Sequence, residues 1–179
     1  GQRSIEEACQ LKKLDAEKIV EEIRQLMSTR DTDSINFQSW PLDLLADYVE
    51  KKHHRYVEET TPALMRYLDK LCQVHGARHP ELPEIRHIFG ESAQDLAMHM
   101  KKEELVLFPY IRKLVSGQRS KREMDAPPFG TVQNPVQMMM QEHETEGERF
   151  RRISELTSNY NPPADACNTY RVTYSLLQE

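Results

Sequence analysis

The sequence predicts an all-α protein, an antiparallel four-helix bundle preceded by a small pair of helices. Four long segments have apolar residues at helical spacing, and none shows the strict alternation of a β-strand. Only six of the 179 residues are glycine, while 30% are charged, a composition that favours amphipathic helices. Such helices bury one apolar face against each other, and four of them enclose a common core.

The N-terminal part, residues 1–30, is predicted to form a small helical domain. Ser4 and Glu7 have the spacing of a capping box, which marks the start of a first helix. Asp15 starts a second helix, in which Ile19 and Ile23 recur at helical spacing. A polar stretch with several turn formers, near residues 28–39, then separates this unit from the main domain.

The main domain, residues 40–179, contains the four long helices of the bundle. The predicted segments are 40–76, 81–117, 134–160 and 162–179. Gly76 and Gly117 close the first two segments, in the position that glycine often takes after a helix. The connections are short to moderate in length, which favours antiparallel packing of successive helices.

Composition excludes several classes of function. The net charge is −5, and Lys and Arg do not cluster among aromatic residues, so nucleic acid is not an expected partner. No apolar run approaches the roughly 20 residues of a membrane span, and no signal peptide is visible. The three cysteines form no Cys-x-x-Cys pair, and their odd number argues against a disulfide framework. We therefore expect a protein of the reducing cytoplasm.

Two polar residues of the second long segment share its predicted core face. At about 100° per residue, His99 and Glu103 fall within the same arc, about 60° wide, as the apolar residues. That face consists of Ile85, Phe89, Ser92, Leu96, Val106, Tyr110 and Leu114. An unpaired buried carboxylate is costly, so Glu103 needs a partner. A buried pair with arginine, a hydrogen-bonded histidine and a metal between helices are all consistent with this helix.

The third long segment favours the metal. Its apolar face is set by Val136, Met139, Met140 and Phe150, and His143 falls in the middle of that face. Gly147, one turn later, leaves room beside His143. A hydrogen-bonded core histidine explains His143 alone, but inward histidines on two neighbouring helices together with an inward Glu are better explained by a metal.

The first long segment offers three histidines. Ideal periodicity puts His53 near the centre of the buried face and His54 at its edge, so either could be a ligand. His75 lies 21 residues beyond His54, about 31 Å along a continuous helix, which is too far for the same site.

Two Glu-x-x-His pairs match the ligand spacing of ferritin-like bundles, Glu50–His53 and Glu84–His87. Glu84 and His87 fall outside the inward arc of their helix, so a ferritin-like di-iron site is not favoured.

Four stretches together resemble one family. They are HHRYV, VHGARHPEL, HMKKEELVLFPYI and MQEHETEGE, and their order and spacing are similar to the hemerythrin-like domain of the iron–sulfur cluster repair di-iron proteins, the YtfE/ScdA family. The resemblance covers nearly the whole chain. It implies a hemerythrin-like bundle whose helices hold two non-haem, oxo-bridged iron ions with four His and two bridging Glu.

Carried over to this sequence, the resemblance makes His54, His99 and His143 ligands and Glu103 a bridging ligand. In that family a cysteine pair precedes the residues matched here, and a second His-x-x-x-Glu follows in the fourth helix. We therefore expect residues 1–30 and the fourth helix to be truncated forms of their counterparts. The site is expected to be incomplete in this chain, with exchange of a helix in a homodimer as one way to complete it.

The function that the resemblance implies is repair of iron–sulfur clusters damaged by nitric oxide or oxidative stress, by iron donation. Its partners would be damaged iron–sulfur proteins, with NO or O₂ as small ligands. Whether the di-iron centre also makes the protein an enzyme is left open. A hemerythrin-like sensor of O₂ or NO, and a structural bundle without metal, are the alternatives.

Overall fold

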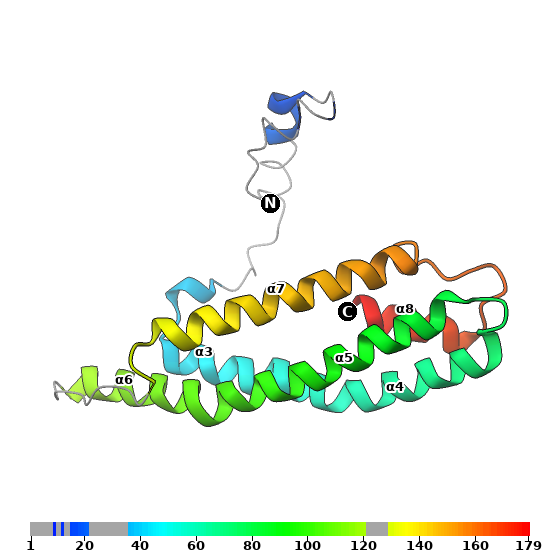
Figure 1. Ribbon diagram of the computed structural model, residues 1–179. Helices are drawn as coiled ribbons and strands as arrows, with labels where there is room; N and C mark the ends of the chain where they lie inside the picture. The colour runs from blue at the N-terminus through cyan, green and yellow to red at the C-terminus, as the bar shows by residue number, and fades with distance from the viewer. Residues whose placement is uncertain (1–8, 10–11, 13–14, 22–35, 121–128) are drawn as a thin grey trace. The chain divides into compact units, whose positions relative to one another are not determined.

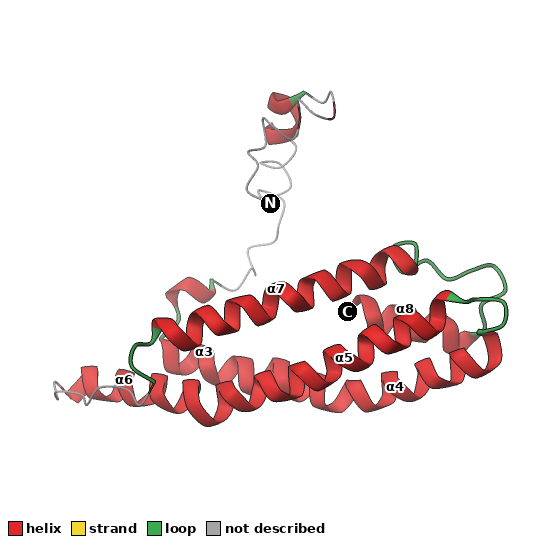
Figure 2. Cartoon of the chain, in the orientation of Figure 1, coloured by secondary structure: helices red, strands yellow, loops and turns green. Residues whose placement is uncertain are grey.

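The computed structural model describes residues 9, 12, 15–21, 36–120 and 129–179, and every regular element among them is a helix (Figures 1 and 2). The predicted all-α class is confirmed. The chain divides into two compact units, residues 1–40 and 41–179. No helix within the described ranges is long and apolar enough to cross a membrane.

In the N-terminal unit, Asp15 caps a helical segment as predicted. Its carboxylate accepts hydrogen bonds from the backbone N–H groups of Glu17 and Lys18, which satisfies free donors of the first turn. A short 3₁₀ helix, η1 (Phe37–Ser39), follows. The predicted first helix from Ser4 and the later turns of the second, including Ile23, lie outside the described residues.

The second unit is built from four helical rods, two of which change helix type midway. The first contains α3 (Leu42–Tyr48), η2 (Val49–His54) and α4 (Arg55–His75), and the second contains α5 (Glu81–Lys102), η3 (Glu103–Leu107) and α6 (Phe108–Ser120). The third is α7 (Gln133–Leu156) and the fourth is the shorter α8 (Asn168–Gln178). α4 packs against α5 and α8, α5 against α7, and α3 against α6, as in an antiparallel bundle (Figure 1).

Both η2 and η3 are π-helical turns, and they change which residues face the core. A π turn contains about one more residue than an α turn, so every later residue is rotated back by about 100°. Leu107 is therefore buried and Val106 is 46% exposed, where ideal periodicity placed Val106 inward. The same shift places His54 in the interior and His53 at the surface.

The face of α7 also differs from the prediction. Met139, Glu146 and Ile153 are buried, seven residues apart, whereas Val136 and Met140 are exposed. The predicted inward positions of Val136 and Met140 were wrong, because the buried side of α7 runs through Met139, Glu146 and Ile153.

Two apolar clusters form the core. One joins α4, α5, α7 and α8 and includes Leu68, Ile85, Ile153 and Tyr170. The other contains Ala46, Leu107, Phe108 and Met139. Along each of the first three rods, the predicted site histidine lies between residues of one cluster and residues of the other. The polar site is therefore flanked by apolar core on both sides along the bundle.

Candidate metal centre

Glu103, the first residue of the π-helical turn η3, lies between two imidazoles. Its Oε2 is 3.0 Å from His54 Nε2, and its Oε1 is 3.6 Å from His99 Nε2. The three side chains are only 7%, 8% and 12% exposed for His54, His99 and Glu103 respectively. One carboxylate therefore connects histidines from two different rods inside the bundle. His54 also stacks on Phe108, which fixes the plane of its ring.

A second carboxylate orients each of these histidines. His54 Nδ1 is 2.7 Å from Glu104 Oε1, and His99 Nδ1 is 2.8 Å from Glu142 Oε2. Lys102 forms an ion pair with Glu142. Hydrogen bonds of this kind fix the tautomer and the orientation of a histidine, and leave its Nε2 free for a metal.

Sequence reasoning did not identify Glu104 and Glu142. Their only signal is adjacency, because Glu104 follows Glu103 directly and Glu142 precedes His143. On a regular helix neighbours point about 100° apart, so periodicity placed both on other faces.

His143 completes the group from α7. Its ring centroid is 4.6 Å from that of His99. His99, Glu103 and His143 each offer one ligand atom, and these atoms lie within 4.8 Å of one another. His143 is exposed, however, and not in the middle of a buried face as the sequence predicted. Met140, three residues earlier on the same face of α7, is exposed as well.

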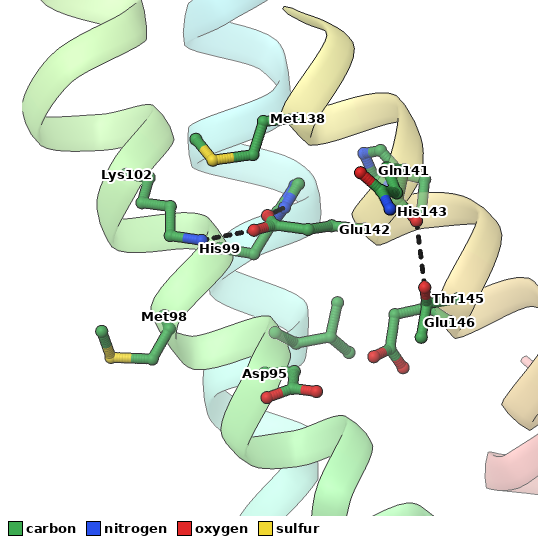
Figure 3. Close-up of a pocket in the computed structure, with 11 residues that line it drawn as sticks. Asp95, Met98, His99, Lys102, Met138, Gln141, Glu142, His143, Thr145 and Glu146 are labelled. Atoms are coloured by element: carbon green, nitrogen blue, oxygen red, sulfur yellow. Dashed lines mark hydrogen bonds and ion pairs between the residues drawn. The ribbon is translucent and has the colours of Figure 1, made fainter. Parts of the chain in front are cut away.

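A cavity of about 340 Å³ opens beside this group, between α5 and α7. Figure 3 shows Glu142 reaching from α7 toward Lys102 and His99 on α5, and Asp95 and Glu146 also line the cavity. Glu146 is buried, and among the described residues its Oε2 has no hydrogen-bond partner. Gly147 leaves open space, because a Cβ there would meet nothing within 4 Å.

The structure leaves the other candidate residues outside the group. His53 is exposed and packs on Tyr48, while Glu50 pairs with Arg112. Glu84 pairs with Arg152 on the outside of α5. His87 is 73% exposed. Neither Glu-x-x-His pair therefore points into the bundle, and His75 lies at the opposite end of α4.

The electrostatics of the centre stabilise charged groups. The hydrogen bond to Glu103 raises the pKa of His99 against the opposing effect of burial, and Glu142 adds to this. Burial opposes ionisation of Glu103, but its hydrogen bonds with His99 and the charges of His99 and His54 outweigh it and lower its pKa. The pKa of Glu142 is also lowered, because Lys102 and His99 outweigh its burial. The carboxylates are held ionised, as metal ligands must be.

The fold and the site, a helical bundle with two buried histidines around one carboxylate, are those of a cation-binding protein. Comparison with known sequences gives the same class. Residues 45–178 match the family described as the hemerythrin HHE cation binding domain. The iron–sulfur cluster repair protein ScdA of Staphylococcus haemolyticus is 30% identical over 177 residues, covering 99% of this chain and 75% of that protein. The iron–sulfur cluster repair protein YtfE of Yersinia pseudotuberculosis is 29% identical, covering 100% of this chain and 75% of that protein.

The chain belongs to the hemerythrin HHE family, in the group of ScdA and YtfE. The resemblance inferred from the sequence motifs is thereby confirmed.

Proposed function

We propose that the chain binds iron through His54, His99, Glu103 and His143 and serves in the repair of damaged iron–sulfur clusters. The observation that carries this proposal is the position of Glu103, whose two oxygens face two histidines from different rods. The relatives ScdA and YtfE are named iron–sulfur cluster repair proteins, which supports a role in cluster repair.

The donor set fits iron. Imidazole nitrogen and carboxylate oxygen are ligands that iron binds well, and a negative carboxylate between two cations reduces their repulsion. Glu103 is held ionised between His54 and His99, which makes its carboxylate available to a cation. Among the described residues the Oε2 of Glu146 has no hydrogen-bond partner, and a cation in the adjoining cavity would supply a partner. When bound, the iron supplies one-electron redox chemistry between its ferrous and ferric states.

The protein residues then have distinct tasks. Glu104 and Glu142 hold the imidazoles of His54 and His99 with Nε2 directed at the metal position. Exposed His143 forms the side from which an iron ion can be released as cargo, since the cavity between α5 and α7 begins there. A centre that is rigid on one side and open on the other suits iron donation.

Three imidazoles and one carboxylate do not fill the coordination positions of two iron ions. We propose an oxo-bridged pair in which further ligands come from outside these four residues. A second copy of the chain in a homodimer is one source, and exposed Val136 and Met140 on α7 provide apolar surface for such an association.

The three free cysteines are consistent with a reducing cytoplasm.

The test of the proposed function is an iron-transfer assay. The iron-loaded chain is mixed with a [4Fe–4S] enzyme whose cluster has been damaged by nitric oxide or peroxide, and recovery of that enzyme's activity is measured. We expect recovery with the loaded chain and none with the loaded His99→Ala preparation. Equal recovery from the same amount of free ferrous iron would contradict iron donation. It would favour a sensor that binds NO or O₂ in the cavity.

We also predict the effect of neutralising Glu142, the carboxylate that orients His99. Glu142→Gln keeps the size of the side chain but weakens the hydrogen bond that orients His99, so iron affinity should fall about 10- to 100-fold. Glu148→Gln on the same helix removes a charge that is 70% exposed and should leave the affinity unchanged. Competition with a chromogenic chelator measures both, and equal affinities would show that Glu142 does not support the centre.

A further inference from the structure

A second cluster of reactive side chains lies at the opposite end of the bundle. His75 ends α4, and its Nε2 is 3.4 Å from the thiol Sγ of Cys167, which precedes α8. His75 and His54 are 21 residues apart on one continuous helix, about 31 Å along its axis. The candidate metal centre therefore does not use this pair.

His75 is only 5% exposed, and the bonding of its ring is incomplete. Its Nε2 faces Cys167, but within the described ranges nothing hydrogen-bonds to Nδ1. A buried polar atom without a partner costs about 1–3 kcal/mol, so a purely structural histidine is poorly suited to this place. The rings of His79 and Tyr170 pack edge-on against the imidazole and hold its orientation toward the thiol.

Cys167 is open to solvent and lies at a helix N-terminus. The residue is exposed, and it is the N-cap of α8, an 11-residue helix whose first turn carries partial positive charge. Asp165 lies two residues earlier, and its carboxylate pairs with Arg78 at 2.9 Å and lies 3.0 Å from His79 Nε2. The Cys167 thiol thus lies next to the buried imidazole of His75, at the N-terminus of α8, and is accessible to solvent.

We propose that Cys167 is a peroxide-reactive thiol and that His75 is its general base. The imidazole Nε2 accepts the thiol proton, and the sulfur attacks one oxygen of a hydroperoxide. An S–O bond forms and the O–O bond breaks, so the sulfur is oxidised by two electrons to a sulfenic acid and the peroxide is reduced. The leaving oxygen takes the proton back from His75 and departs as water or an alcohol.

The other two cysteines serve as internal references. Cys9 is buried, and Cys72 is half-buried with a pKa that burial raises, which keeps its thiol protonated. Neither has the combination of exposure, histidine and helix N-terminus that Cys167 has in the structure.

The experiment treats the 179-residue chain with hydrogen peroxide and dimedone, and locates adducts by peptide mass spectrometry. A matched exposed thiol comes from the double variant Cys167→Ser/Ser175→Cys, since Ser175 is an exposed residue of the same helix. We expect Cys167 to be labelled about tenfold faster than the thiol at position 175. His75→Gln should lower the rate at Cys167 about tenfold, while His87→Gln should not change it.

Equal labelling of Cys167 and the thiol at 175 would overturn the proposal, as would an unchanged rate in a folded His75→Gln chain. Circular dichroism establishes whether His75→Gln folds, and the comparison with position 175 decides the matter if it does not. Iron binding plays no part in this readout, so its outcome is independent of the metal centre.

Discussion

We expect Glu103→Ala to remove iron binding from the chain. Glu103 is the only residue in the described structure that lies against both His54 and His99, so its loss deletes a shared ligand and leaves the imidazoles without a carboxylate between them. Losing an outer carboxylate weakens metal affinity about 10- to 100-fold, and we expect a larger loss here, more than about 100-fold. The measurement is iron per chain after anaerobic loading and gel filtration.

Glu50→Ala is the matched control for this variant. Glu50 is also a partly buried Glu within a π turn, but it pairs with Arg112 instead of the histidines. Its variant should retain the iron of the unmodified chain. If both variants kept their iron, Glu103 would be no ligand, and if both lost it, the π turns would be needed for folding rather than for binding.

His54→Ala is expected to lose iron as strongly, while His53→Ala keeps it. The two residues are neighbours, but His54 is buried against Glu103 and Glu104, and His53 is exposed beside Tyr48. Substituting His53 therefore removes a surface side chain, whereas substituting His54 removes a proposed nitrogen ligand from the candidate metal centre. Iron content and thermal unfolding of the two variants are compared under the same loading conditions.

The reverse result, loss in His53→Ala only, would mean that the π turn of η2 is absent from the iron-bound protein. His75→Ala extends the comparison to the far end of α4, and its iron content should be unchanged.

The fold was predictable because helical periodicity and glycine positions act locally. Most rod ends lie within a few residues of the expected positions, and α4 stops before Gly76 as predicted. The prediction that Gly117 closes the second rod was wrong, because Gly117 is buried inside α6, which continues to Ser120. The fourth helix begins at Asn168, later than expected.

On the second rod, inward positions were correct up to the π turn, as for Ile85, Phe89 and His99. Beyond that turn an extra residue moves the register by one, and no pattern in the sequence marks where that residue is inserted. α7 is an α-helix throughout, and the inward positions predicted there for Val136 and Met140 were wrong as well.

The candidate site was predictable to a similar degree. His99, Glu103 and His143 come together as predicted, although His143 is exposed and not on the buried face of its helix. Choosing His54 over His53 needed the family resemblance, because the π turn that separates them is invisible to a constant period. Glu104 and Glu142 could not be found, since their role depends on how α4, α5 and α7 are packed together and not on their own helix.

We propose that one carboxylate and three histidines from three rods hold iron together. The most direct test is a crystal structure of the iron-loaded chain with anomalous diffraction measured at the iron absorption edge. We predict an anomalous peak in contact with Glu103, His99 and His54 or His143, and none near His75 and Cys167. Iron bound only at surface carboxylates, or an iron-loaded crystal with no peak beside Glu103, would contradict the account.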